Sequence, residues 1–494
     1  MSKGMVNMKK TAIKIGIALV FIFGAFDVNA QNEFEAWKKQ QINDFSDYKS
    51  KQDKEFASFL KAHWVEIKGQ KSKPLYDRNK IIKPPVAPTL VKKEPPKKVV
   101  IVKLPEKKPE EKKPGVPVVV PKLLPIRGES IKLLFFGNEL VFPYDKKMIK
   151  RMHTKIDKDA ISSHWSLLAR SDYEPLLKQL DSVNQNLSLN DWAYAVLVHK
   201  LAGALYPGQE NEQVLFSWFI LIKSAYRSRL AYENNRVYLL MPIKQQVYAA
   251  QSLLYKNQKY YVLGFDGGKQ PKINSVFTYD SEYQGSDRLF DLQLPRMIAT
   301  GNEDFRREFA FNYSKKRYQI ITVNNKYIVD FMRTYPQVHW DVYFNSNPVN
   351  PTRQQLADQL RPVLNELNEV DAVNLLLRFV QTAFKYDTDD RQFGYENPLF
   401  LEETLFYPAS DCEDRSFLFS WLVKELLGLE VVGLLYPGHM ATAVHVNMDV
   451  KGDSVRYQGK TYFVADPTYT NADIGMAMPK FQSKKPEFIR VSNI

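Results

Sequence analysis

The sequence predicts an α+β protein of several domains, and three observations support this fold class. At 494 residues the chain is longer than one hydrophobic core normally accommodates. Apolar residues recur at helical spacing on both sides of a central region in which apolar and polar residues alternate as in β-strands. A segment rich in proline and lysine separates these globular patterns from a helical pattern near the N-terminus.

Residues 1–30 are typical of a signal peptide. Lysines precede the apolar run Ile15–Phe26, and Val28-Asn29-Ala30 places small residues at the cleavage position. The run has 12 residues, whereas a bilayer-spanning helix needs roughly 20. We therefore expect cleavage after Ala30, a periplasmic or secreted protein, and no integral membrane segment in the mature form.

Residues 31–70 predict a long amphipathic helix with an 11-residue repeat of aromatic residues. The repeat consists of Phe34, Phe45 and Phe56 together with Trp37, Tyr48 and Phe59. Eleven residues make three helical turns, so these side chains form one stripe along the helix. Two interpretations stay open: the stripe mediates self-association, as in a coiled coil, or it contacts a membrane or cell-wall partner.

Residues 71–125 predict a stiff, extended linker, because they hold 12 of the 28 prolines and cannot bury a core. They carry 15 Lys and Arg residues against 5 Asp and Glu residues, which accounts for most of the net charge of +14. The remaining chain is close to neutral, so we do not expect nucleic acid as a partner.

The globular patterns divide into three regions. Residues 126–270 predict a mixed helical and β region, residues 271–350 predict a β domain with a hairpin about Asn324-Asn325, and residues 351–494 predict helices followed by strands. The elements expected in the first and third regions are a hairpin at Ile131–Phe142, helices at Asp191–Tyr206, Gln209–Tyr226, Thr352–Leu367 and Val370–Phe384, and strands at Arg229–Met241, Val247–Tyr255 and Lys259–Phe265.

The only cysteine of the chain, Cys412, precedes an apolar helical pattern, within Ser410-Asp411-Cys412-Glu413-Asp414-Arg415. A thiol at a helix start meets unpaired N–H groups and the positive end of the helix dipole, which favour the nucleophilic thiolate. The alternative is a small buried apolar residue.

A histidine and an aspartate follow Cys412 at intervals of 27 residues. His439 follows Pro437-Gly438 at the start of an apolar strand, and Asp466 ends a strand before Pro467. We expect His439 to be the base, in preference to His445 on the same strand, and Asp466 to orient it. Nucleophile, base and orienting carboxylate in this order make a cysteine acyl-transfer site.

At these residues, Tyr407–Pro467 resembles the transglutaminase-like branch of papain-fold cysteine enzymes. The resemblance covers about residues 370–480 and implies a helix bearing Cys412 packed on an antiparallel sheet. It also implies thiol attack on a carboxamide, with Cys412 as nucleophile, His439 as base and then acid, and Asp466 as its orienting group. Crosslinking members of the family carry Trp where this chain has Thr442, so we favour hydrolysis over acyl transfer to an amine.

The resulting hypothesis is an exported cysteine peptidase or amidohydrolase whose partner is a peptide or protein substrate, with cell-wall peptides as one candidate. The rival hypothesis is an inactive envelope scaffold. Gln392 and Tyr407 are candidates for the second oxyanion donor. We expect no cofactor and no metal: Asp387, Asp389 and Asp390 lack the spacing of a calcium loop and predict a solvated acidic turn.

An internal repeat is a further hypothesis. Phe216-Ser217-Trp218 matches Phe419-Ser420-Trp421, and each helix is followed by strands. In this alignment Gln209, Arg236 and Phe265 fall opposite Cys412, His439 and Asp466, so the first copy would be a degenerate, inactive one. The alternative is that any helix followed by a hairpin shows such similarity.

Overall fold

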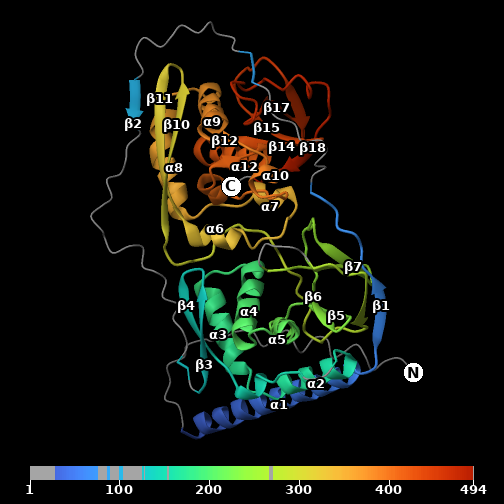
Figure 1. The fold of residues 1–494 in the computed structure, drawn as a ribbon. Coiled ribbons are helices and arrows are strands. Elements are labelled where there is room, and N and C mark those ends of the chain that lie inside the picture. Colours follow the sequence, from blue (N-terminus) through green and yellow to red (C-terminus); the bar gives the residue numbers. More distant parts are fainter. Residues whose placement is uncertain are drawn as a thin grey trace. The chain divides into compact units, whose positions relative to one another are not determined.

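The structure is a computed structural model that describes residues 28–75, 86–88, 100–103, 125–126, 128–152, 155–265 and 271–492. The predicted α+β class is confirmed: helices accompany one sheet that nearly closes into a barrel and another that curls into a half-barrel (Figure 1). Most of the expected signal peptide and most of the expected linker lie outside the described residues. Within the described part of the chain, every helix is too short or too polar to cross a bilayer.

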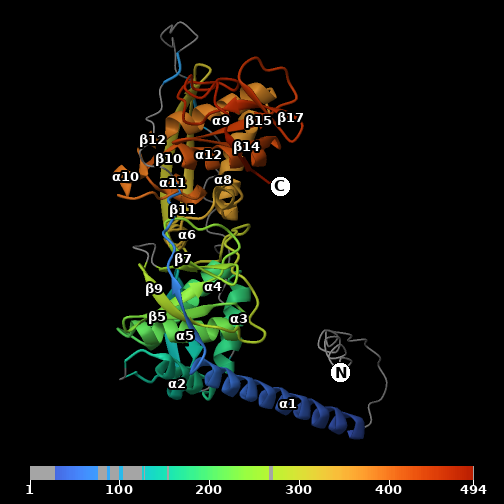
Figure 2. The same cartoon turned by 90° about the vertical axis from the view of Figure 1, so that its right-hand side faces the viewer.

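The N-terminal helix α1 (Val28–Leu60) is unbroken (Figure 2). Through Glu55 it forms a compact unit of its own, and residues from Phe56 onward form a second unit. Three aromatic side chains of the first unit are exposed: Phe34 is 56%, Trp37 is 55% and Tyr48 is 49% exposed.

The helix expected over residues 31–70 is too long. It ends at Leu60, and Trp64–Lys68 is strand β1, which pairs antiparallel with β9 (Ser275–Tyr279). A strand is stabilised by a partner far away in the chain, so a local repeat of aromatic residues does not reveal where the helix gives way to it.

A hairpin and two helices precede the first large sheet. The hairpin expected at Ile131–Phe142 is confirmed. It turns at Phe136-Gly137, where Gly137 has the positive φ of 79° that a tight turn favours. Asp157 caps the helix that follows by accepting a hydrogen bond from the Ala160 N–H at 2.8 Å. The elements are β3 (Ser130–Phe135), β4 (Asn138–Pro143), α2 (Lys158–Ala169) and α3 (Glu174–Asn186).

The first module, as we call α4, α5 and β5 to β9, places two helices beside an antiparallel sheet. Its strands have the order β1-β9-β5-β6-β8-β7, and a bridge between Gln70 and Ser252 nearly closes the sheet. Both helices and the β5–β6 hairpin match the prediction, whereas the second hairpin is shorter than expected. The bounds are α4 (Asp191–Leu205), α5 (Glu210–Lys223), β5 (Arg229–Glu233), β6 (Arg236–Met241), β7 (Gln251–Tyr255) and β8 (Gln258–Val262).

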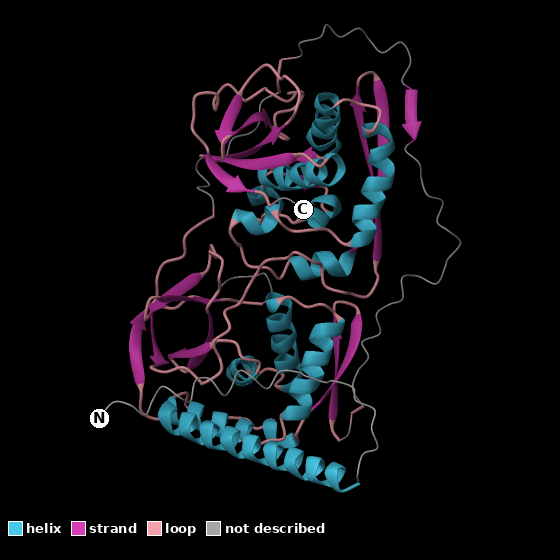
Figure 3. Ribbon diagram, turned by 180° about the vertical axis from the view of Figure 1, so that it is seen from behind, coloured by secondary structure: helices cyan, strands magenta, loops and turns pink. Residues whose placement is uncertain are grey.

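The expectation of a purely β region over residues 271–350 is wrong. Strands β10 (Asp304–Tyr313) and β11 (Lys316–Asn325) form a long ribbon (Figure 3), but two short helices follow it. The ribbon turns at Ser314-Lys315, both with positive φ. Asn325 instead caps α6 by accepting from the Tyr327 N–H at 3.0 Å. The remaining elements are α6 (Lys326–Met332), α7 (Trp340–Phe344) and β2 (Val100–Lys103), which pairs parallel with β11.

The second module, as we call α9, α12 and β14 to β18, has the same kind of architecture. Its helix α12 is followed by five antiparallel strands in the order β16-β17-β15-β14-β18. The bounds are α8 (Asn350–Leu364), α9 (Glu369–Ala383), β12 (Lys385–Tyr386), α10 (Asp389–Gln392), α11 (Leu401–Phe406), β13 (Ala409–Ser410), α12 (Cys412–Leu422), β14 (Glu430–Tyr436), β15 (His439–His445), β16 (Ser454–Tyr457), β17 (Lys460–Ala465) and β18 (Glu487–Arg490).

The two modules share one strand order. Starting from the strand that comes last in the chain, the first sheet runs β9-β5-β6-β8-β7 and the second runs β18-β14-β15-β17-β16. Every pairing in both series is antiparallel. In each module, therefore, a helix is followed by two hairpins and a fifth strand that returns beside the first.

Close packing against β14 gives the first prediction. A Cβ atom on Gly433 would lie 2.8 Å from two ring carbons of Phe344 and 3.0 Å from Cβ of Ile489. Gly433→Ala should therefore lower the free energy of unfolding by about 1–3 kcal/mol, as overpacking does. Gly203→Ala is the control: nothing lies within 4 Å of its Cβ, so the better helix former should stabilise by up to about 1 kcal/mol. Urea denaturation measures both, and equal effects would contradict the packing described.

Candidate functional site

Cys412 lies where the sequence predicts, at the first residue of α12. The first turn of the helix is fixed by the backbone N–H of Asp411, which donates to the Asp414 carboxylate at 3.2 Å. The second carboxylate oxygen of Asp414 accepts from the Leu399 N–H at 2.8 Å. Cys412 is 5% exposed, so a substrate reaches its sulfur only along a narrow approach or after a local movement.

His439 and Asp466 are brought together. His439 is the first residue of β15, Asp466 follows the last residue of β17, and His439 Nε2 lies 2.8 Å from Asp466 Oδ2. Both side chains are almost completely buried. The other oxygen of Asp466 accepts from the N–H groups of Thr468 and Tyr469 at 2.9 and 3.2 Å. The carboxylate is thus held in one orientation, and its bond to Nε2 leaves Nδ1 as the ring nitrogen for other chemistry.

One hydroxyl group connects the start of α12 with the start of β15. Ser416 Oγ lies 2.8 Å from the carbonyl oxygen of Cys412 and 3.3 Å from that of Met440, the residue after His439. The backbone of the cysteine and the backbone next to the histidine therefore lie on two sides of a single oxygen atom. The predicted packing of the cysteine helix against the histidine strand is present in the structure.

The surroundings of Cys412 are acidic. Its thiol donates to Glu413 Oε2 at 3.1 Å, and several further carboxyl groups are buried nearby in sequence or space. Together with Glu413, the buried carboxyl groups are those of Asp389, Glu396, Glu402, Glu403, Asp411 and Asp414. The buried Arg415 does not neutralise them by direct contact, because its guanidinium donates to the carbonyl oxygens of Gln381 and Phe384 at 3.3 and 2.8 Å.

Burial shifts the acid equilibria of this carboxyl cluster. Loss of solvation raises the pKa of Glu402 to about 7 and that of Glu403 to about 8. Burial likewise raises the pKa of Asp414 to about 7. The pKa of Glu413 is raised well above its usual range, first by burial and then by the negative charge that the neighbouring thiolate would carry. Near neutral pH the cluster therefore holds protons that exposed carboxylates would release.

Three members of the cluster also have the arrangement of cation ligands. One oxygen each of Asp389, Asp411 and Glu413 lie within 4.8 Å of one another. Oxygen-rich sites of this kind suit hard cations such as Ca²⁺. The interpretation of Asp389 as part of a solvated acidic turn is wrong, because its side chain is 3% exposed. A sequence without the fold does not show that this residue is adjacent to the Asp411-Cys412-Glu413 segment.

The other candidate residues lie in different surroundings. His445 is at the far end of β15, where its Nδ1 lies 2.8 Å from the carbonyl oxygen of Thr461. Tyr407 accepts a hydrogen bond from Arg333 Nε and packs its ring edge against Phe393. Gln392 ends the short helix α10 and is partly exposed. Thr442 donates to the carbonyl oxygen of Ala465 on β17.

Two residues that sequence reasoning missed hold the pair in place. The ring of Phe481 stacks on that of His439, with centroids 5.0 Å apart and planes at 12°. Gln381 on α9 donates to the carbonyl oxygen of Asp466 at 3.0 Å and accepts from the Asn471 N–H at 3.1 Å. No local motif marks either residue, since each acts only through segments that are remote in the chain.

No family model, no curated protein and no solved structure matches this chain. The site is therefore defined by its own geometry: a cysteine at a helix start, a histidine at the start of the adjacent strand, and a carboxylate bonded to that histidine.

The raised pKa values of the carboxyl cluster predict how stability depends on pH. In the unfolded chain these groups release protons near pH 4, whereas in the folded state Glu402, Glu403 and Asp414 keep them to about pH 7–8. The folded state then binds more protons, so the free energy of unfolding should fall as pH rises from about 5 to 8.

Glu403→Gln tests this, because its carbonyl oxygen can still accept the 3.0 Å hydrogen bond from the Phe400 N–H. In the variant, the free energy of unfolding should decrease less steeply with pH. The slope should change by up to about 1.4 kcal/mol per pH unit, the contribution of one proton. The exposed Glu366→Gln is the control and should leave the slope unchanged. Urea denaturation between pH 5 and 8 measures the slope; equal slopes in both variants would contradict the protonated state of Glu403.

Proposed function

We propose that this protein is an exported, transglutaminase-like cysteine peptidase or amidohydrolase that acts on a peptide or protein amide. The observation that carries the proposal is the buried His439–Asp466 hydrogen bond of 2.8 Å, formed on the strand that packs against the N-terminal turn of the Cys412 helix. A histidine fixed by a carboxylate beside a cysteine at a helix start is the arrangement of a thiol nucleophile and its base.

The proposed reaction proceeds in two steps. The Cys412 thiol gives its proton to His439, and the sulfur attacks the amide carbon. The carbon–nitrogen bond then breaks as His439 returns the proton to the departing amine. In the second step water gives a proton to His439 and its oxygen forms a bond to the acyl carbon. The sulfur–carbon bond breaks and the proton goes back to sulfur.

Each residue contributes a distinct physical effect to these steps. The N–H groups at the start of α12 favour negative charge on the sulfur and on the carbonyl oxygen of the tetrahedral intermediate. Asp466 keeps the proton of the imidazole on Nε2 and stabilises the imidazolium that forms. The stacked ring of Phe481 limits rotation of His439.

A second function, that of an inactive envelope scaffold, is favoured by the acidity around the thiol. A thiolate at Cys412 would face Glu413 Oε2 at 3.1 Å and the other buried carboxyl groups. Two neighbouring negative charges repel each other in a buried site. Activity therefore requires that Glu413 is protonated or that a cation neutralises the cluster, and the scaffold hypothesis requires neither.

Alkylation of Cys412 by iodoacetamide distinguishes the two functions. In the enzyme, the rate near pH 7 should fall on the order of tenfold in His439→Ala, because the imidazolium no longer stabilises the thiolate. His445→Ala is the matched control, since it removes a histidine of the same strand that lies apart from the His439–Asp466 pair, and the rate should not change. Slow alkylation in the wild type with no effect of His439→Ala would establish the scaffold.

The fate of the acyl-enzyme separates hydrolysis from acyl transfer. A peptide mixture incubated with the active protein should yield new carboxylates by mass spectrometry, because Thr442 stands where crosslinking relatives carry Trp. Adding glycine methyl ester as an amine should leave most product as the free acid. If the amide with the added amine predominates, the protein is a transamidase.

A further inference from the structure

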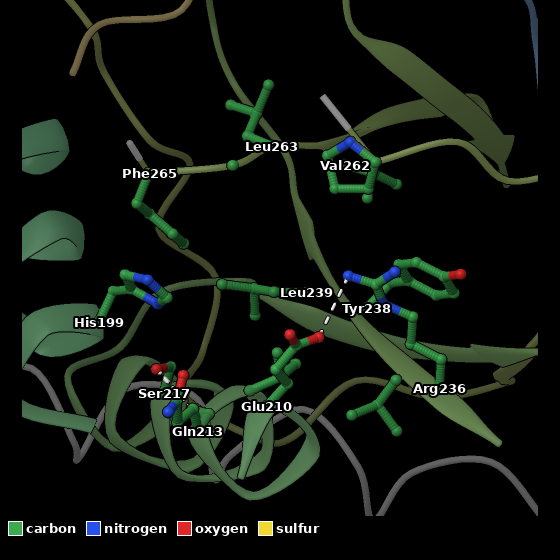
Figure 4. A pocket seen from close by; sticks show the side chains of 14 residues that line it. His199, Glu210, Gln213, Ser217, Arg236, Tyr238, Leu239, Val262, Leu263 and Phe265 are labelled. Carbon is green, nitrogen blue, oxygen red and sulfur yellow. Dashed lines mark hydrogen bonds and ion pairs between the residues drawn. The ribbon is translucent and has the colours of Figure 1, made fainter. Parts of the chain in front are cut away.

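The first module contains a cavity of about 280 Å³, seen from close by in Figure 4. It lies between the N-terminal half of α5, the start of β6 and the segment after β8, with one contribution from α4. Its lining includes His199, Glu210, Arg236 and Phe265. The volume is near the lower end of ligand pockets in proteins, which hold roughly 300–1,000 Å³.

The cavity includes the position in the first module that corresponds to His439 in the second. Arg236 is the first residue of β6, just as His439 is the first residue of β15. Gln209 is the residue before α5, whereas Cys412 is the first residue of α12. Phe265 stands three residues after the end of β8, whereas Asp466 follows β17 directly. The shared strand order makes this correspondence structural, in addition to the sequence match of the two helices.

The chemistry at this place differs between the modules. In the sequence alignment of the two helices, the thiol, the imidazole and the carboxylate of the second module fall opposite the amide of Gln209, the guanidinium of Arg236 and the phenyl ring of Phe265. Arg236 and Phe265 line the cavity. These groups form no nucleophile and base, so covalent catalysis of the same kind is excluded there. A lined cavity without a thiol is suited to binding.

The lining favours a ligand with a carboxylate beside an apolar side chain. At the rim, Arg236 Nη2 and Glu210 Oε2 form an ion pair of 3.4 Å whose side chains are 55% and 78% exposed. Such an exposed pair is weak and is readily exchanged for another partner. A guanidinium binds a carboxylate through two parallel N–H donors. Inside, the ring of Phe265 stacks on those of His199 and Trp192, with centroids 4.6 and 5.3 Å apart. Phe265 lines the cavity together with the apolar Leu239 and Leu263.

We propose that this cavity binds the carboxyl-terminal residue of a peptide. The terminal carboxylate lies on Arg236 in place of Glu210, and the terminal side chain packs against Phe265. In combination with the proposed function, on which this last step rests, the first module holds the free end of a peptide substrate without reacting with it. A cavity of this volume holds one or two residues, so the rest of the peptide extends outside.

Isothermal titration calorimetry on the full chain carrying Cys412→Ala tests the proposal. The probes are a tetrapeptide of three alanines and a C-terminal phenylalanine, and the same peptide with a C-terminal amide. The free acid should bind at least about tenfold more tightly than the amide, because only the acid offers a bidentate partner to Arg236. Equal binding of the two peptides, or no binding of the acid, would overturn the proposal.

Two rim variants serve as a matched pair. Arg236→Gln should reduce binding of the free acid to the level of the amide. Glu210→Gln should strengthen binding of the acid, because it removes the internal carboxylate that competes for Arg236. Both side chains are mostly exposed, so thermal unfolding should show that the fold is kept. Weakened binding in Glu210→Gln, or unchanged binding in Arg236→Gln, would exclude Arg236 as the carboxylate site.

The two proposals fail separately. Arg236 takes no part in the chemistry at Cys412, so Arg236→Gln in the otherwise unmodified chain should leave the alkylation rate of Cys412 unchanged. Binding selective for the free acid together with an unreactive Cys412 would refute the enzyme and keep the peptide site. A reactive Cys412 with no selective binding would do the reverse.

Discussion

The complete burial of α12 is the constraint on which the site depends. Every residue from Cys412 to Leu422 is buried, including Glu413, Asp414 and Arg415. An ordinary amphipathic helix turns its charged residues to solvent, whereas here the helix is surrounded and its polar groups must find partners inside the protein. Ser416 contacts β15, Asp414 holds the chain at Leu399, and Arg415 holds the chain at Phe384. The first turn, which carries the thiol, is therefore rigidly placed.

In this buried position, two opposing effects act on the ionisation of the Cys412 thiol. The helix terminus favours a negative charge on sulfur, while Glu413 and its neighbours disfavour it as long as they are ionised. Burial, and then the charge of a neighbouring thiolate, raise the pKa of Glu413, which favours a proton on this carboxyl group. The ionisation of Cys412 is thus coupled to that of the carboxyl cluster, and its reactivity depends on the state of the whole cluster.

Much of this arrangement could be predicted from the sequence, where local signals are strong. The polar residues before Cys412 mark the start of α12, and Gly137-Asn138 and Asn234-Asn235 mark hairpins that the structure contains. The sequence also places His439 at the start of a strand, and His439 is the first residue of β15. Each of these features is determined by capping or turn geometry within a few residues.

The features that could not be predicted depend on distant partners. Trp64–Lys68 is a strand only because β9, some 200 residues away, pairs with it. Asn324-Asn325 resembles a turn, but Asn325 caps a helix and the ribbon turns elsewhere. Asp389 looks solvated until the fold encloses it beside Asp411. Phe481 and Gln381, which fix His439 and Asp466, carry no local signal at all.

The pairing of β1 with β9 determines how the chain just after α1 resists a pulling force. All five of its residues are in register with β9, and the chain enters at one end of the strand and leaves at the other. Hydrogen bonds between antiparallel strands run perpendicular to the strand axis. A force that pulls β1 along its axis relative to β9 would therefore load the whole ladder in shear, and its bonds would resist together instead of opening one after another.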